Sequence, residues 1–313
     1  MPGALRLANA WQRGFPLVPR PFAAIAGRSG RSEAEVLDAF KRLRASGVID
    51  RVGPVFRPNA VGASCLAALA VPGSRIEQVA ALVSRHEGVN HNYEREHRVN
   101  LWFVVTGAHD AAVQATLARI EAESGLRALR LPLLEEFHID LGFDLETHAA
   151  PRARRAESAS SLSEREKELV RALAPGLALV ERPYAIAAFP EHAVIETLGA
   201  WLDAGIVRRL GAVLRHRRLG YEANAMVVWD VPDEELRELG RRLGSDAAVT
   251  LCYRRARALP DWRYNLYCMV HGRSRARSLY EVKRISTLHG LGRYPRSILF
   301  SRRCFSQRAA RYG

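Results

Sequence analysis

The amino-acid sequence is written twice, and this duplication constrains the fold more than any other feature. Short strings recur about 160 residues apart. The matched strings are RPF (20–22) with RPY (182–184), GPVFR (53–57) with GAVLR (211–215), and HNYERE (91–96) with LCYRRA (251–256). Asn100-Leu101-Trp102 likewise corresponds to Asn265-Leu266-Tyr267. One long period predicts two copies of a whole domain pair, because solenoids repeat at 20–50 residues.

Each copy begins with helical segments that end in a glycine. In 32–49 the apolar residues Val36, Leu37 and Phe40 fall on one helical face, and 190–207 is the corresponding segment. Gly47 and Gly205 stand where a glycine ends a helix. Short strands follow, so each copy is expected to begin with a winged helix-turn-helix.

The rest of each copy alternates strands and helices in the order β-α-β-β-α-β, which is ferredoxin-like. In the first copy we expect strands at 64–71, 89–95, 99–106 and 127–134, with helices at 75–86 and 109–123. In the second we expect strands near 223–231, 248–254, 263–270 and 294–300. The segment between the copies mixes Pro, Ser, Ala and charge. Ser163 and Glu166 then form a capping-box pattern that starts a helix.

The predicted fold class is therefore α+β, a tandem duplication of a winged helix-turn-helix and a ferredoxin-like module. The expected domains are a winged helix-turn-helix at 1–57, a ferredoxin-like domain at 58–148, a linker at 149–162, a second winged helix-turn-helix at 163–215 and a second ferredoxin-like domain at 216–313.

The net charge of +14 is unevenly distributed. Residues 151–313 hold 30 cationic and 17 acidic residues, whereas 1–150 are almost neutral. This half of the chain should meet an anionic partner, such as nucleic acid, a membrane surface or a small polycarboxylate. There is no apolar run of membrane-spanning length and no CxxC pair among the four cysteines, so we expect a cytoplasmic protein.

A winged helix-turn-helix with a ferredoxin-like module resembles the AsnC/Lrp family of regulators. The charges argue against DNA binding, however. Glu33, Glu35 and Asp38 occupy the part of the first recognition helix that would meet phosphates, and 190–207 contains no Lys or Arg. The cations gather instead in 208–221 and 252–264, interleaved with Tyr, Trp and His. Arginines with aromatic rings suit a flat molecule edged with carboxylates.

Longer strings carry a more specific resemblance over nearly the whole chain. They are FPLVPRPFAAIA (15–26), VNHNYEREHRVNLWFVVT (89–106), LPLLEEFHIDLGFDL (131–145), RRLGAVLRHRRLGYEANAMVVW (208–229), CYRRARALPDWRYNLYCMVHG (252–272) and LFSRRCF (299–305). In these strings the chain resembles the siroheme decarboxylases of d1-type haem and alternative haem biosynthesis, in the form that fuses two paralogous subunits.

The resemblance implies loss of carbon dioxide from two acetate side chains of siroheme, giving didecarboxysiroheme. The electron pair left on each methylene can delocalise into the macrocycle, and a histidine can supply the proton. No cofactor is then required, and the iron belongs to the substrate. The sequence has no glycine-rich nucleotide fingerprint and no P-loop.

Within the matching motifs the expected catalytic residues are His97, His216 and His91. Either His97 or His216 could instead ligate the substrate's iron, and the sequence does not separate the two roles. The expected substrate-binding residues are Tyr93, Arg95, Asn100, Arg215, Tyr253, Arg254, Arg255, Trp262, Arg263 and Tyr264. For Asn100, strand pairing alone is an alternative explanation.

The two copies differ at these motifs. Leu251 replaces His91 and Pro58 replaces His216 in the matching positions, so neither copy holds a complete set. We therefore expect one composite site, with His91 and His97 facing His216 and the arginines of the second copy. Leu251 and Cys304 also depart from the family pattern. The departure at Leu251 leaves open a variant that performs one decarboxylation only or that depends on a partner paralogue.

Two other functions stay open at this point. The runner-up is a haem- or tetrapyrrole-responsive transcription regulator of AsnC/Lrp type, and the weaker alternative is a siroheme carrier. Siroheme or a related iron tetrapyrrole is the expected partner, together with paralogous subunits or a second identical chain, and neither DNA nor a membrane is expected.

Overall fold

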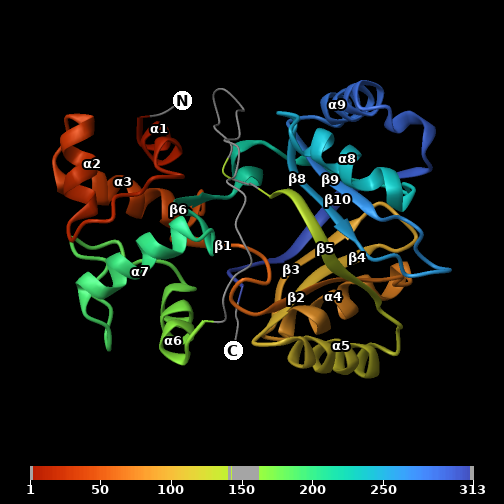
Figure 1. Ribbon diagram of the computed structural model, residues 1–313, viewed down its shortest axis with the longest axis horizontal. Coiled ribbons are helices and arrows are strands. Elements are labelled where there is room, and N and C mark those ends of the chain that lie inside the picture. Colours follow the sequence, from red (N-terminus) through yellow and green to blue (C-terminus); the bar gives the residue numbers. More distant parts are fainter. Residues whose placement is uncertain (1–2, 140–141, 143–161, 311–313) are drawn as a thin grey trace. The chain divides into compact units, whose positions relative to one another are not determined.

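The computed structural model describes residues 3–139, 142 and 162–310, which fall into two compact units. One unit contains the helix-turn-helix segments of both copies, residues 3–61 and 162–219. The other contains both ferredoxin-like segments, residues 62–139, 142 and 220–310 (Figure 1). The fold class is the one expected, but each unit draws on both copies. The expected linker, 149–162, lies outside the described residues except for Leu162.

The first unit is built around a two-stranded sheet to which each copy gives one strand. Strands β1 and β6 run antiparallel, and Gly53 lies opposite Gly211. Each copy thus supplies half of a shared wing rather than a wing of its own. A Cβ atom at Gly211 would lie 2.3 Å from the carbonyl oxygen of Trp11, so only glycine allows this approach. The elements are α1 (Gly3–Ala10), α2 (Pro21–Ser29), α3 (Glu33–Ala45), β1 (Ile49–Phe56), α6 (Glu164–Leu173), α7 (Glu191–Asp203) and β6 (Val207–Leu214).

The helix termini of this unit follow the sequence signals. Ser163 and Glu166 form the expected capping box at the start of α6, and Ser32 and Glu35 form another at α3. Gly47 and Gly205 adopt positive φ angles of 72° and 68° after α3 and α7. These glycines end the helices because an L side chain is strained in that conformation.

The second copy lacks a counterpart of α2, which corrects the expectation of two equal helix-turn-helix segments. Residues 174–190, all described, form turns between α6 and α7. Pro190 disfavours helix at the residue before it, and Ala188 has a positive φ of 71°. The Tyr184 hydroxyl donates to the carbonyl of Pro16 at 2.7 Å, so this segment is held against the first copy instead.

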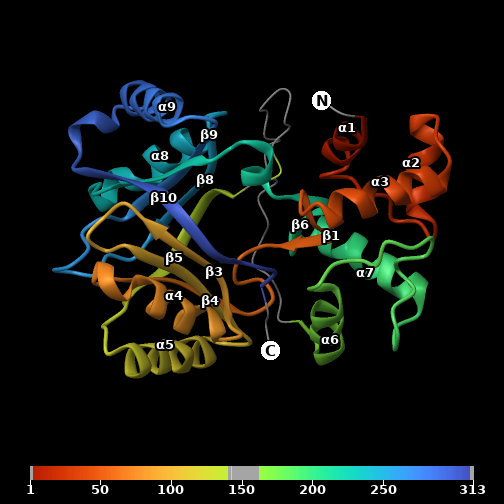
Figure 2. The same ribbon diagram turned by 180° about the vertical axis from the view of Figure 1, so that it is seen from behind.

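The second unit is a closed eight-stranded sheet covered by helices on two opposite faces (Figures 1 and 2). The strand order is β10-β3-β4-β2-β5-β8-β9-β7. Its first-copy elements are β2 (Ala63–Leu69), α4 (Ile76–Arg85), β3 (Val89–Arg95), β4 (Leu101–Gly107), α5 (Asp110–Ser124) and β5 (Leu129–Ile139). Its second-copy elements are β7 (Ala223–Trp229), α8 (Asp233–Gly244), β8 (Val249–Arg255), β9 (Leu266–Gly272), α9 (Arg275–Leu288) and β10 (Arg296–Gln307).

Strands β5 and β10 close the sheet by crossing from one copy to the other. The first part of β5, Leu129–Pro132, pairs with β2, and Leu133–Ile139 pairs with β8. Likewise Arg296–Phe300 pairs with β7, and Ser301–Gln307 pairs with β3. Both strands therefore extend beyond the expected 127–134 and 294–300, because each pairs with one strand from each copy.

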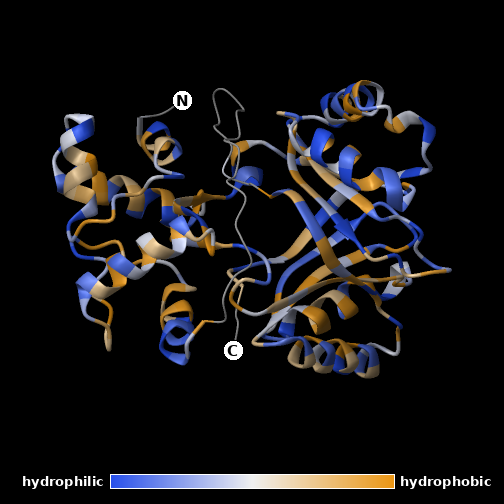
Figure 3. Ribbon diagram, viewed as in Figure 1, coloured by the Kyte–Doolittle hydropathy of each residue, from blue (hydrophilic) through white to orange (hydrophobic). Residues whose placement is uncertain are grey.

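Three apolar clusters follow from this arrangement. Helices α4 and α5 pack on one outer face, and α8 and α9 pack on the other. The third cluster fills the interior of the closed sheet and includes Trp102, Tyr253, Trp262, Tyr267 and Met269. Figure 3 shows both hydrophobic and hydrophilic residues on the strands of this sheet. None of the described helices is long and apolar enough to cross a membrane.

Candidate active site

The inner face of β3 carries three of the predicted residues in a row. His91, Tyr93 and Arg95 alternate with Asn92, whose amide donates outward to the Ala80 carbonyl at 3.0 Å. The rings of His91 and Tyr93 lie 6.3 Å apart, and the Arg95 guanidinium lies 5.8 Å from the Tyr93 ring centre. The period of two along a strand explains why these three share one face.

Arg95 is buried where β10 changes partner. Its Nη1 donates to the Leu299 carbonyl at 3.2 Å, and its Nη2 lies 3.9 Å from Met269 Sδ on β9. The guanidinium also lies close enough to His271 to lower the pKa of that imidazole, although burial of the ring is the larger cause. Together they bring the pKa of His271 to about 4, so this histidine is neutral at pH 7.

Tyr253 and Arg255 repeat the arrangement in the second copy. Arg255 Nη1 donates to the Leu131 carbonyl at 2.6 Å, where β5 changes partner, and its guanidinium lies 4.6 Å from the Tyr253 ring. Tyr253 is buried and stacks on Tyr267, with ring centres 5.6 Å apart. Tyr93 and Tyr253, and likewise Arg95 and Arg255, thus have equivalent surroundings in the two copies, as their matching positions in the sequence predict.

A cluster of aromatic rings lies just past the C-terminal end of β3 and contains His97, Trp262 and Tyr264. The ring of Trp262 lies 5.3 Å from His97, 5.0 Å from Trp102 and 4.9 Å from Tyr264. Its indole nitrogen donates to the Tyr267 hydroxyl at 2.7 Å. His97 and Trp262 come from different copies, so this aromatic cluster joins the two.

His97 is held as a neutral imidazole. Its Nδ1 accepts a hydrogen bond from the Val99 amide at 3.0 Å, so the proton of the neutral ring is on Nε2. Burial, helped by the charge of Arg98, lowers the pKa of His97 below its usual value. His91 is the third residue of β3, whereas His97 lies two residues past the end of the strand. That the two histidines contribute to one site stays a prediction.

Four predicted binding residues are held by neighbouring groups. The Asn100 amide exchanges two hydrogen bonds of 2.9 Å with the backbone of Val71, and Asn265 does the same with Val231. These bonds tie Asn100 to the loop after β2, and its substrate-binding role stays a prediction. Arg254, Arg263 and Arg215 form ion pairs with Asp233, Asp230 and Asp50 at 3.0, 2.7 and 2.7 Å.

His216 belongs to the first unit. It lies in a short 3₁₀ turn, His216–Leu219, directly after β6, and its side chain is buried. Its position opposite His91 stays a prediction, as does its catalytic role.

A pocket of about 950 Å³ is lined by His271 and by residues outside the predicted site. Thr250 also lines it, and Thr250 Oγ1 is 2.8 Å from His271 Nδ1. Three arginines and two tyrosines line the pocket, and Arg284 is paired with Asp246. Arg273 lies 5.0 Å from the Tyr221 ring, and Arg277 lies 5.3 Å from the Tyr280 ring, which is 58% exposed. His271 and Tyr221 do fall within quoted motifs, but their convergence depends on long-range strand pairing.

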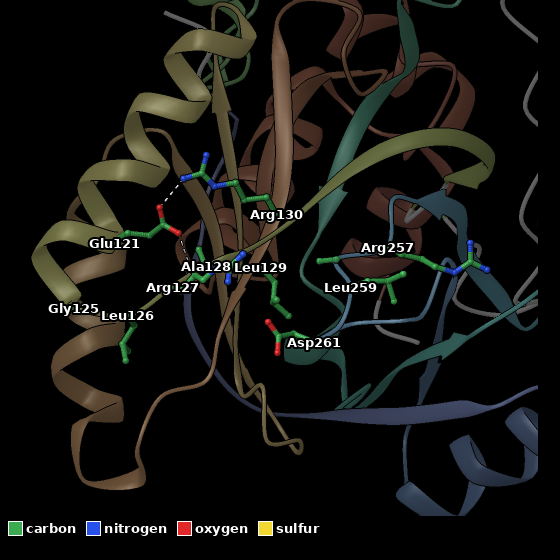
Figure 4. Close-up of a pocket in the computed structure, with 11 residues that line it drawn as sticks. Glu121, Gly125, Leu126, Arg127, Ala128, Leu129, Arg130, Arg257, Leu259 and Asp261 are labelled. Carbon is green, nitrogen blue, oxygen red and sulfur yellow. Dashed lines mark hydrogen bonds and ion pairs between the residues drawn. The ribbon is translucent and has the colours of Figure 1, made fainter.

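A second hollow, of about 760 Å³, lies where the end of α5 and the start of β5 face the loop around Leu259 (Figure 4). Glu121 is its main polar group, and it accepts from Arg130 at 2.6 Å and from the Ala128 amide at 2.8 Å. None of the predicted site residues lines it. Among the described residues, no three His, Cys, Asp or Glu side chains are grouped to hold a metal ion.

Comparison with known proteins decides which family has this arrangement. A model of the AsnC-like ligand-binding domain matches residues 60–138 and 218–306, and a model of the siroheme decarboxylase NirDL-like helix-turn-helix domain matches 6–49. The siroheme decarboxylase NirDL subunit of Paracoccus denitrificans is 45% identical over 312 residues, covering 98% of this chain and 96% of the relative. The chain belongs to the siroheme decarboxylase family.

Members of the siroheme decarboxylase family occur both as single chains and as separate subunits. The NirD subunit of Stutzerimonas stutzeri is 52% identical over 140 residues, which cover 45% of this chain and 92% of that subunit. A crystal structure of the siroheme decarboxylase NirDL in complex with an iron-uroporphyrin III analogue has a TM-score of 0.70 and 27% identity, covering 98% of this chain and 93% of that one. The internal duplication thus corresponds to two subunits of other family members.

Proposed function

We propose that this chain is a siroheme decarboxylase that removes carbon dioxide from two acetate side chains of siroheme. The observation that carries the proposal is the family relationship over the whole length of the chain. We place the reaction on the inner face of β3, where His91 and Tyr93 precede the buried Arg95. The Arg95 guanidinium acts on the imidazole of His271, which lines a pocket of about 950 Å³, large enough for a tetrapyrrole.

The reaction makes modest demands on the protein. The bond between the acetate methylene and its carboxylate carbon breaks, carbon dioxide leaves, and the electron pair stays on the methylene. That pair delocalises into the conjugated macrocycle until a proton reaches the carbon and completes a methyl group. Atoms and electrons balance without an oxidant, so we propose that the protein adds no cofactor to the iron tetrapyrrole, which is the substrate.

We assign the arginines to the substrate's carboxylates. Arg273 lines the pocket and is exposed, and Arg95 is buried. A guanidinium binds a carboxylate through two parallel hydrogen bonds, and Tyr221 and Tyr280 offer flat faces to the macrocycle. These groups recognise siroheme by its acidic edge and its flat ring.

We assign proton delivery to His91, with Tyr93 beside it. His271 is a poor proton donor at pH 7 because its pKa is about 4. His97 is neutral and lies at the far end of β3, where its Nδ1 lone pair already accepts the Val99 amide. In that state neither nitrogen of His97 is available to ligate iron. We therefore propose His91 as the proton donor and exclude His97 from the groups that react with the substrate.

Anaerobic incubation with siroheme, followed by mass spectrometry of the tetrapyrrole, tests the activity. We expect the loss of two carbon dioxide molecules with no added cofactor and no second protein, since both repeats are present in one chain. Unchanged siroheme with a folded protein would refute the proposal.

Two variants test the assignment of the proton donor. A general acid contributes on the order of 10²–10⁴ in rate, so His91→Ala should lower kcat by roughly 10²-fold. His97→Ala is the matched control and should keep kcat within about threefold of the wild-type value. A loss confined to His97→Ala would reverse the assignment.

A further inference from the structure

The pocket at His271 contains two carboxylates of its own, Asp246 and Glu281. Both are largely buried, since the Asp246 side chain is 5% exposed and the Glu281 side chain is 14% exposed. Arg284, which lines the same pocket, binds them both. It donates to Asp246 through its two terminal nitrogens at 3.0 and 2.5 Å, and its Nε donates to Glu281 at 2.7 Å. A pocket that we assign to a polycarboxylate thus holds groups with the same charge as its ligand.

These carboxylates decide which guanidiniums of the pocket a ligand can use. Arg284 is fully engaged, because all three of its nitrogens donate to Asp246 and Glu281. Arg277 Nη2 lies 2.8 Å from Glu281 Oε1, but the Arg277 side chain is 66% exposed, so a ligand can reach it. Within the part of the chain that the structure describes, no carboxylate pairs with Arg273. Glu281 and a carboxylate of the ligand would therefore compete for Arg277.

The first copy shows that the fold does not need the pair of Arg277 and Glu281. Helices α5 and α9 are in the same register, since in each the residue before the helix caps the amide three residues later. In this register Ala112 takes the place of Arg277. Thr116 takes the place of Glu281, and its hydroxyl donates to the carbonyl of Ala112 at 3.0 Å. The ion pair is thus specific to the copy that contains the pocket and is not required to pack the helix on its sheet.

We propose that Glu281 limits the affinity of the pocket for carboxylated tetrapyrroles by competing with the ligand for Arg277. When a ligand carboxylate binds this guanidinium, Glu281 keeps only Arg284 as its partner, and two like charges come close together. When the ligand leaves, Glu281 pairs with Arg277 again. The inference rests on the proposed function, in which the product still carries carboxylates after two have been lost as carbon dioxide. It adds that Glu281 promotes the dissociation of this product.

Titration with iron uroporphyrin measures the competition without turnover. Glu281→Gln keeps the size of the side chain and removes its charge, so we expect it to tighten binding by roughly three- to tenfold relative to the wild type. Glu238→Gln is the matched control, because Glu238 is exposed on α8 and does not line the pocket, and it should bind as the wild type does. Equal affinities of the two variants, or weaker binding by Glu281→Gln, would overturn the inference.

A second comparison tests whether the competition is for Arg277. In an Arg277→Ala background, Glu281→Gln should change the affinity by less than about twofold, because the group for which the two carboxylates compete is gone. The same tightening in both backgrounds would mean that Glu281 acts by general repulsion, which contradicts the inference. Glu281→Thr carries the residue of the first copy, so it repeats both comparisons if the glutamine variant is poorly folded by circular dichroism.

The inference and the proposed function can fail separately. Didecarboxysiroheme added to the assay should inhibit Glu281→Gln at least about threefold more strongly than the wild type. Tighter binding of iron uroporphyrin by Glu281→Gln, with no product formed from siroheme by the wild type, would count against the proposed function alone. Decarboxylation by the wild type, with equal binding by the Glu281 and Glu238 variants, would count against the inference alone.

Discussion

Burial of the His271 imidazole makes the stability of the closed sheet depend on pH. The unfolded chain binds a proton near pH 6.5, whereas the folded chain binds it only near pH 4. Between these values the unfolded state holds more protons, so the free energy of unfolding falls as the pH falls. The full effect of this group is about 3 kcal/mol, from 1.36 kcal/mol per pKa unit.

The contribution of His271 can be isolated by urea unfolding of the wild type and His271→Gln between pH 7 and pH 4. The stability difference, wild type minus variant, should become smaller by up to about 3 kcal/mol across this range. Carboxylates that titrate in the same window affect both proteins equally. Parallel stability curves would mean that His271 can be protonated in the folded state.

Asn100 and Asn265 form the same structural link in the two copies. Each amide satisfies one backbone N–H and one carbonyl of a loop residue, Val71 or Val231. Since each unsatisfied buried polar group costs about 1–3 kcal/mol, Asn265→Ala should destabilise the protein by roughly 2–4 kcal/mol. Urea unfolding measures this loss, and KM for siroheme should not change. A raised KM with unchanged stability would instead give Asn265 the substrate-binding role predicted for its counterpart Asn100.

At the scale of the elements, local signals in the sequence predicted the helices well. Ser163 with Glu166 and the glycines at 47 and 205 act within one or two turns, so their effect is readable from neighbouring residues. The lengths of β5 and β10 were not predictable in this way, because Leu133–Ile139 and Ser301–Gln307 are strands only by pairing with the other copy. The pocket at His271 was not predicted for the same reason. The Tyr93–Arg95 and Tyr253–Arg255 pairs were predicted because they occupy matching positions in the two repeats.

The second part of β10 is an element whose removal should open the closed sheet. Without residues 301–313, β3 loses its partner strand and becomes an exposed edge. The truncated chain should aggregate, or melt at least about 10 °C below the wild type by circular dichroism. Removal of 311–313 alone is the matched control and should leave the melting temperature within about 2 °C. Equal melting of both truncations would show that the sheet does not depend on this closure.

At the scale of the whole molecule, the two copies are not separate folding units. Within the part of the chain that the structure describes, strand β1 pairs with β6 alone, and both strands that close the larger sheet cross between copies. Residues 1–148 or 149–313 alone would leave β1 or β6 unpaired and expose the edges that β5 and β10 cover. We therefore expect each fragment by itself to aggregate or to pair with a second identical copy.

When both fragments are produced together, they should elute as a 1:1 complex and decarboxylate siroheme, as the existence of separate family subunits suggests. Size-exclusion chromatography with the mass-spectrometric assay measures both properties. A monomeric, cooperatively folded fragment would show that the copies are independent domains and that the shared strands are dispensable.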